Sequence, residues 1–275
     1  LRRVAVCGFP NLWRLELLSD APLDVSLELP ALSCLRLHGN IQVDAFPATL
    51  EEVELSELRG RSGDERRPGY PETLAKLPVS LKRLRVDRGG AYATVLPPGL
   101  VRLELSGEAE LGPLPKLRVL RWRDAWTLGF DPRDMPELDA LYLHGFKTKT
   151  LDLSAAPRLS RVRLESMKRL EALTLPSSVH TAKLRGLSGL RTLHLEAPSG
   201  LRRLVLDGCT KFDVATFHAP QSLRTLSLRG SVRAHDEVPA PLVALVEEPH
   251  LRAPAIELGA GPDPPGGFKR LRTML

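Results

Sequence analysis

The feature that most constrains the fold of this chain is a spacing of apolar residues that recurs along most of its length. In each copy, apolar residues occupy the first, fourth and sixth positions, as in Leu32, Leu35 and Leu37. Eleven copies are present, and they begin at residues 12, 32, 50, 81, 100, 117, 138, 159, 179, 201 and 223. A unit of about 20 residues that recurs in this way is typical of repeat proteins, in which neighbouring units share one continuous core.

Apolar and polar residues alternate at the end of each copy, which predicts a short β-strand with one buried face. One such strand cannot bury its leucines alone, whereas stacked strands bury them against each other. Leucine supplies 54 of the 275 residues, and the hydrophobic fraction of 43% is too high for a disordered chain. The 24 prolines and 21 glycines argue against long helices between the copies. We therefore expect a mostly β, right-handed solenoid of short parallel strands with few helices.

A second set of apolar spacings lies halfway between the copies in the C-terminal half of the chain. It comprises residues 148–153, 170–175 and 190–195, each of which ends in leucine, any residue, leucine. These segments predict strands, rather than helices, on the back of the coils as well.

Two copies carry a resemblance to a known family. The sequence LSCLRLHGN at 32–40 matches the leucine-rich repeat consensus LxxLxLxxN, and LRRLVLDGC at 201–209 matches it with cysteine at the last position. A proline precedes several copies, as in PATL at 47–50, which resembles the bacterial class with LPxxLxxLxL units. The resemblance covers about residues 1–245 and implies a curved right-handed superhelix that binds other proteins. The asparagine position holds asparagine only at Asn40, so the resemblance does not extend to an asparagine ladder.

The repeat spacing and the composition together predict the domain organisation. We expect a leucine-rich repeat solenoid over residues 1–247, with an inserted loop at about 58–76 where the interval between copies lengthens to 31 residues. Residues 70–76 are long enough for one helical turn. Residues 248–275 are predicted to be a linker rich in proline and glycine, followed by a short basic tail.

Sequence motifs of catalysis are absent from the chain. It contains no GxGxxG, P-loop, HExxH, CxxC or GxSxG pattern, so we predict no catalytic residues, no cofactor-binding residues, no metal ligands and no enzymatic activity. Cys209 takes the family's buried position, Trp122 replaces a core leucine, and Cys34 is expected to point outward. No run of about 18 apolar residues predicts a membrane span. We expect a cytoplasmic protein, with a secreted effector as the alternative.

The charged residues are concentrated on one predicted face. In the pattern xLxLx, the three x positions point away from the core and form three columns across the stacked strands. These columns hold 13 basic and 7 acidic residues, a net charge of +6, which equals the net charge of the whole chain. Outside the columns, 26 basic residues balance 26 acidic ones. The charge excess is therefore predicted to lie on this concave face.

Much of this face is expected to be a ladder of opposite charges on adjacent strands. Three groups of like charges are left over from the ladder, namely Arg83 with Arg102, Arg121 with Arg123, and Arg161 and Arg163 with Lys183. Tyr142 is predicted to lie between Arg121 and Arg163, as an interface hot spot. The candidate partner-binding residues are Arg83, Arg102, Arg121, Arg123, Tyr142, Arg161, Arg163, Lys183 and Arg185.

The favoured function is a non-enzymatic scaffold that binds an acidic protein surface through its basic concave face. A targeting domain of a larger bacterial effector or enzyme is the first alternative, because ligases with such repeats carry a separate catalytic domain. Nucleic-acid binding is the second alternative. The sequence pI near 9.5 permits phosphate contacts, but the aromatic content of 5% and the interleaved acids argue against it.

Overall fold

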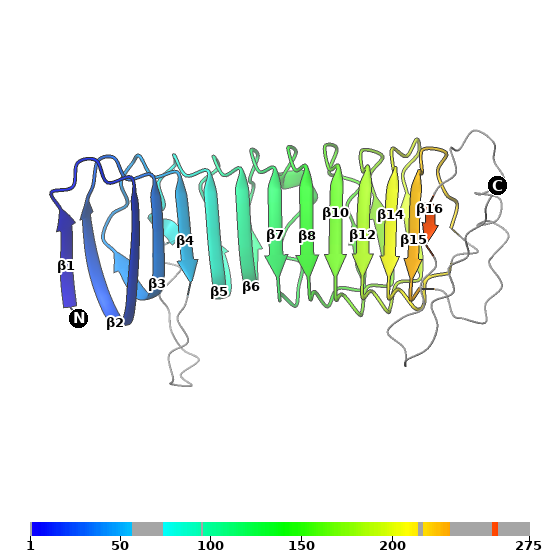
Figure 1. The fold of residues 1–275 in the computed structure, drawn as a ribbon, viewed down its shortest axis with the longest axis horizontal. Helices are drawn as coiled ribbons and strands as arrows, with labels where there is room; N and C mark the ends of the chain where they lie inside the picture. Colours follow the sequence, from blue (N-terminus) through cyan, green and yellow to red (C-terminus); the bar gives the residue numbers. More distant parts are fainter. Residues whose placement is uncertain (1, 57–73, 95, 214–216, 232–254, 258–275) are drawn as a thin grey trace. The chain divides into compact units, whose positions relative to one another are not determined.

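The computed structural model describes residues 2–56, 74–94, 96–213, 217–231 and 255–257 (Figure 1). The chain divides into two compact units, unit 1 (Leu1–Glu137) and unit 2 (Leu138–Leu275). Each unit is a parallel β-solenoid built mostly of strands, as the apolar spacing predicts. Helical structure in the described residues is confined to residues 74–75 and one turn of 3-10 helix, η1 (Pro132–Asp134).

Unit 1 is a single series of parallel strands in which each strand pairs with the next one along the chain. The strands are β1 (Arg2–Cys7), β2 (Arg14–Glu28), β3 (Cys34–Val43), β4 (Glu52–Ser56), β5 (Arg83–Thr94), β6 (Arg102–Leu111) and β7 (Val119–Arg123). Side chains alternate between core and surface, so that β4 buries Val53 and Leu55 and leaves Glu54 half-buried. Trp122 is fully buried, as predicted, and donates a hydrogen bond from Nε1 to the Gly107 carbonyl at 2.8 Å.

Several strands of unit 1 are longer than the apolar spacing predicts, because they continue past a corner into a second segment. β2 and β3 pair as far as Ser19 and Gly39, lose their register, and pair again from Leu23 and Ile41. β5 and β6 also show register shifts along their length. β1 pairs only with residues 23–28, which form the second segment of β2. Strands on the back of the coils, predicted only for the C-terminal half, therefore occur in unit 1 as well.

Unit 2 contains two parallel sheets, and both were predicted from the apolar spacing. The front sheet follows the main repeat and consists of β8 (Ala140–His144), β10 (Arg161–Glu165), β12 (Thr181–Arg185), β14 (Arg203–Asp207), β15 (Thr225–Arg229) and β16 (Ala255–Glu257). The back sheet follows the second set of apolar spacings and consists of β9 (Thr150–Asp152), β11 (Ala172–Leu175) and β13 (Thr192–Leu195). The prediction of strands on the back of these coils is confirmed.

A residue with positive φ directly follows the front strand in most coils. In unit 2 these residues have φ between 56° and 80°, and they are Gly145, Ser166, Gly186, Gly208 and Gly230. The left-handed conformation costs an ordinary L-residue about 1–2 kcal/mol, whereas glycine adopts it freely. The next residue turns inward and is buried, as at Phe146, Met167 and Cys209. The position that the repeat consensus gives to asparagine therefore adds an apolar layer to the core here.

A second contact between coils lies at the residue just before the first buried leucine of each copy. Where this residue is serine or threonine, its hydroxyl donates to the carbonyl of the first apolar residue of the preceding copy, as Ser178 Oγ does to Leu159 O at 2.9 Å. Where it is glycine, the backbones approach closely. Gly189 takes the corresponding place in the second set of apolar spacings, just before Leu190, and a Cβ on it would collide with the Lys168 carbonyl oxygen and lie 3.1 Å from that of Leu170. In the copies that carry a hydroxyl-bearing residue at this position, its hydrogen bond thus adds a contact between the coils.

The predicted loop at 58–76 lies outside the described residues except for residues 74–76. Of the predicted linker and tail at 248–275, only β16 is described, and it extends the parallel pairing with Ala255 opposite Thr225. Within the described part of the chain, no helix has the length and apolar character that crossing a membrane requires.

We predict that Gly189→Ala lowers the free energy of unfolding by about 1–3 kcal/mol, because the new methyl group collides with backbone that has no room to move. Urea denaturation followed by circular dichroism measures this change. Gly112→Ala is the control, because a Cβ there has nothing within 4 Å and the φ is not positive. We expect the control to leave stability unchanged or to raise it by up to about 1 kcal/mol. Equal stabilities for the two variants would contradict the close approach between coils.

Candidate functional site

The outward-facing side chains form rows because neighbouring strands pair residue for residue. In unit 1 the first row runs through Arg14, Cys34, Glu52, Arg83, Arg102 and Val119, and the second through Glu16, Arg36, Glu54, Arg85, Glu104 and Arg121. In unit 2 the first row is Ala140, Arg161, Thr181, Arg203 and Thr225, and the second is Tyr142, Arg163, Lys183, Val205 and Ser227. The strand register predicted from the sequence is therefore present within each unit.

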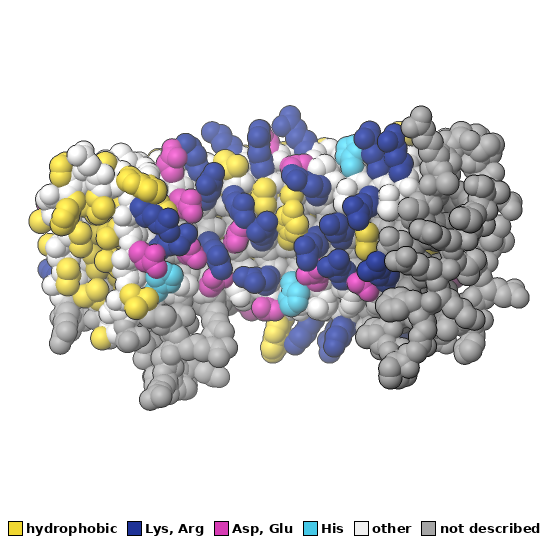
Figure 2. Space-filling model, in the orientation of Figure 1, with side chains coloured by type: hydrophobic (Ala, Val, Ile, Leu, Met, Phe, Trp, Pro, Cys, Tyr) yellow, Lys and Arg dark blue, Asp and Glu magenta, His cyan; other side chains and the backbone are white. Residues whose placement is uncertain are grey.

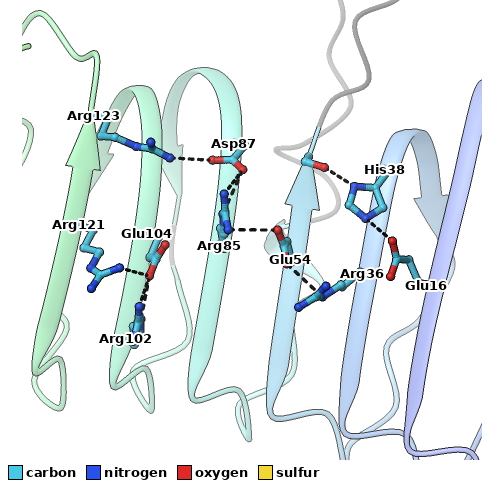
Figure 3. A network of polar contacts seen from close by, with 11 residues as sticks. Glu16, Arg36, His38, Glu54, Arg85, Asp87, Arg102, Glu104, Arg121 and Arg123 are labelled. Atoms are coloured by element: carbon cyan, nitrogen blue, oxygen red, sulfur yellow. Dashed lines mark hydrogen bonds and ion pairs between the residues drawn. The ribbon is translucent and has the colours of Figure 1, made fainter. Parts of the chain in front are cut away.

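The arginines of unit 1 share their carboxylates (Figure 3). Glu54 forms ion pairs with Arg36 at 3.2 Å and with Arg85 at 3.4 Å, while Arg85 also reaches Asp87 at 2.8 Å. Burial alone would lower the pKa of Arg85, but the hydrogen bond and charge of Asp87 outweigh it and raise that pKa. Figure 2 shows the result on the surface, with basic and acidic side chains interleaved.

The four candidate arginines of unit 1 all have acidic partners. The expectation that they lie outside the pairs of opposite charge is therefore wrong. Arg83 pairs with Glu52 at 3.3 Å, and Arg123 pairs with Asp87 at 3.5 Å. Glu104 is shared by Arg102 at 2.5 Å and Arg121 at 3.4 Å (Figure 3). Arg102 and Glu104 are two residues apart on the same strand, whereas the predicted ladder considered only pairs across strands.

His38 closes the network toward β2 (Figure 3). Its Nδ1 lies 2.5 Å from Ser56 Oγ, and its Nε2 lies 3.2 Å from the Glu16 carboxylate. The three residues come from three successive strands, β2, β3 and β4, in adjacent outward rows. Their contacts tie the first coils of unit 1 together at the surface.

The candidate residues of unit 2 differ from one another in their partners. Arg161 pairs with Asp139, whose hydrogen bond and charge raise the pKa of the Arg161 guanidinium. Arg163 donates to Glu165 at 2.6 Å, and Arg185 lies 3.8 Å from the same carboxylate. The expectation of unpaired arginines is therefore wrong for Arg161 and Arg163 as well.

Two candidates of unit 2 lie beside basic or polar neighbours. Lys183 is directly opposite Arg163 in the register and forms no ion pair in the described part of the chain. Tyr142 is half-buried and also pairs with Arg163 in the register, on the other neighbouring strand.

The structure contains a cluster of arginines that were not among the candidate residues predicted from the sequence. Three exposed arginines on consecutive coils, Arg202, Arg203 and Arg224, form no ion pair in the described residues. The backbone stacks them, since Arg202 donates from its N–H to the His180 carbonyl at 2.9 Å and accepts from the Arg224 N–H at 2.8 Å. With Lys183 and their neighbours in the rows, they define a surface that we call the acid-free patch. It comprises His180, Thr181, Lys183, Arg202, Arg203, Arg224 and Thr225.

Sequence reasoning missed Arg202 and Arg224 because they precede the alternating segment of each copy. Each follows directly after the first buried leucine, Leu201 or Leu223, where the chain leaves a turn. The signal is present in the sequence as the dipeptide leucine-arginine at the same place in successive copies. The backbone hydrogen bonds between successive coils stack these turn residues one above another, just as they stack the strands.

The cysteines have clear environments. Cys209 is fully buried, as predicted, and burial raises its pKa to about 11. Cys34 lies in the outward row but is half-buried, and burial and the nearby Glu52 carboxylate raise its pKa as well. Both thiols are therefore poorly reactive, which fits a structural role. No group of three or more potential metal ligands occurs among the described residues.

Comparison with known proteins adds no functional assignment, because no family model and no curated protein matches this chain.

We predict that the three cysteines react with iodoacetamide in the order of their exposure to solvent. Cys7, which is exposed, reacts first at pH 8, Cys34 more slowly, and Cys209 only after unfolding. Mass spectrometry of timed digests measures each rate. Labelling of Cys209 in the folded protein at the rate of Cys7 would show that this coil opens readily.

We predict that Glu104→Gln destabilises the protein by about 1 kcal/mol, because two arginines lose the carboxylate that they share. Glu51→Gln is the matched control, since its pair with Lys82 is more than half exposed on both sides. The control is expected to change stability by less than about 0.5 kcal/mol. Urea unfolding at low and high salt measures both, and an equal effect of the two variants would contradict a special role for the shared carboxylate.

Proposed function

We propose that this chain is a leucine-rich repeat protein that binds an acidic segment of a partner protein through unit 2. The match of residues 32–40 and 201–209 to the repeat consensus supports the family, as does the stacking of parallel strands every 20 residues or so. The buried Phe146, Met167 and Cys209 replace the consensus asparagine, so the proposal concerns a variant with an apolar layer at that position.

The observation that carries the proposed function is the acid-free patch. Like charges on adjacent strands repel each other, and the rows of unit 1 avoid this by placing a carboxylate beside each candidate arginine. In the part of the chain that the structure describes, no carboxylate pairs with an arginine of the patch, although Arg202 and Arg224 are stacked on neighbouring coils. Its side chains are held on a rigid sheet and are available to a partner's acids. Charge complementarity of this kind sets the encounter rate and the choice of partner.

Unit 2 as a whole also favours an acidic partner. Its outward rows on β8 to β15 hold six basic residues, Arg161, Arg163, Lys183, Arg185, Arg203 and Arg229, against the two acids Glu165 and Asp207. The corresponding rows of unit 1, on β2 to β7, hold seven basic residues against five acids. The net charge is thus +4 on the face of unit 2 and +2 on that of unit 1. Of the candidates predicted from the sequence, Lys183 belongs to the patch, and Arg163 and Arg185 lie next to Lys183 in the rows.

The test compares an acidic peptide with a single-stranded oligonucleotide of the same charge, by fluorescence anisotropy with the full chain at several salt concentrations. We expect the peptide to bind and the variant Arg202→Glu/Arg203→Glu/Arg224→Glu to weaken its binding at least about tenfold. The control, Lys168→Glu/Arg169→Glu/Arg191→Glu, changes the same number of exposed charges elsewhere in unit 2 and is expected to bind normally.

Equal weakening by the two variants would mean that net charge alone attracts the peptide, which would overturn the proposed site. Tighter binding of the oligonucleotide than of the peptide, lost in the first variant, would replace the proposed function by nucleic-acid binding.

A further inference from the structure

We infer that the acid-free patch recognises a phosphate monoester on its partner, as in a phosphorylated serine or threonine. This inference rests on the proposed function and narrows it, because it names the chemical group that the patch selects. It follows from the kinds of donor in the patch, from their stacking, and from the acids that border them.

The donors of the patch suit an oxyanion with several acceptor atoms. Arg203 lies in the first row between Thr181 on one neighbouring strand and Thr225 on the other. Strands of one sheet lie about 4.8 Å apart and side chains of one row share a face, so a threonine flanks Arg203 on each side. Neither hydroxyl has a hydrogen-bond partner in the described part of the protein. A phosphate monoester brings three strong acceptor oxygens and a charge of about −1.5 to −2.

The second set of donors lies beside the first. Arg202 and Arg224 are stacked on consecutive coils one residue before Arg203 and Thr225. Arginine presents a planar fork that matches two oxygens of phosphate at once, which a lysine ammonium does not. Three of the four basic residues of the patch are arginines, with Lys183 the exception. A compact dianion on this surface meets arginine forks and hydroxyls together, and a single carboxylate has too few oxygens to use them all.

The acids around the patch argue against a long polyanion. Asp207 ends the strand that Arg203 begins, about 13 Å further along β14. Glu165 is the equivalent residue two strands away, on β10. An extended row of phosphates that crosses the patch along the strands would therefore meet carboxylates, whereas one phosphate group fits within the patch. The patch also has no phenylalanine, tyrosine or tryptophan on which a base could stack. These features favour a phosphorylated protein segment over a nucleic acid.

The experiment uses three short peptides that are neutral except at the centre, where they carry serine, phosphoserine or two adjacent glutamates. Calorimetry with the full chain measures their affinities, with the two triple variants of the previous subsection as test and control. We expect the phosphoserine peptide to bind at least about tenfold more tightly than the diglutamate peptide of similar charge. We also expect the variant Thr181→Val/Thr225→Val to reduce this preference and leave diglutamate binding unchanged.

Each other outcome has a distinct meaning. Equal binding of the phosphoserine and diglutamate peptides, both lost in Arg202→Glu/Arg203→Glu/Arg224→Glu, would overturn the phosphate inference while leaving the proposed function intact. A phosphoserine preference that persists in that triple variant would also overturn it, because the preference would then lie elsewhere. If neither peptide binds and the longer acidic peptide fails as well, the proposed function falls together with the inference.

Discussion

The backbone ladder between successive coils is the constraint on which the rest of this structure depends. Within unit 2, each front strand from β10 to β15 pairs in parallel with the next without a register shift, so equivalent positions of the repeat lie about 4.8 Å apart. The ladder stacks the leucines of the repeat into one core, as at Leu164, Leu184 and Leu206, none of which is exposed. It also brings the backbones close together at several turns, where glycine leaves room for a neighbouring carbonyl and serine donates a hydrogen bond to one.

The same ladder decides the electrostatics of the surface. Because equivalent residues are stacked, a charge that recurs at one position of the repeat lies opposite a like charge on the next strand. Unit 1 offsets this repulsion by placing carboxylates in the neighbouring positions, with Glu54 and Glu104 each serving two arginines. Each opposite-charge pair contributes about 0.2–1 kcal/mol. Among the described residues, no carboxylate pairs with Arg202, Arg203 or Arg224, so there the core and the backbone hydrogen bonds hold the cations together.

The sequence predicted the front strands, their register and the back sheet of unit 2, because apolar alternation encodes which side of a strand is buried. It did not lead us to the second segment of β2, although Leu23, Val25 and Leu27 also alternate. That segment lacks the leucine three positions earlier by which the copies were recognised. The pairing of the arginines was missed for a different reason. A long side chain such as that of Arg163 reaches the carboxylate two residues along its own strand, and a comparison of columns across strands cannot find this contact.

The position of the acid-free patch follows from a difference between strands and turns. Strand positions alternate between core and surface, so their outward residues can be counted from the sequence in columns. Arg202 and Arg224 lie between a turn and the following strand, before the alternation of core and surface residues begins. Only the backbone hydrogen bonds between coils show that the two residues are stacked. Beneath the patch, Leu204 and Leu226 are buried and hold β14 and β15 in place. The backbone that carries these donors is therefore already ordered before a partner arrives, so binding loses less conformational entropy than it would on a flexible loop.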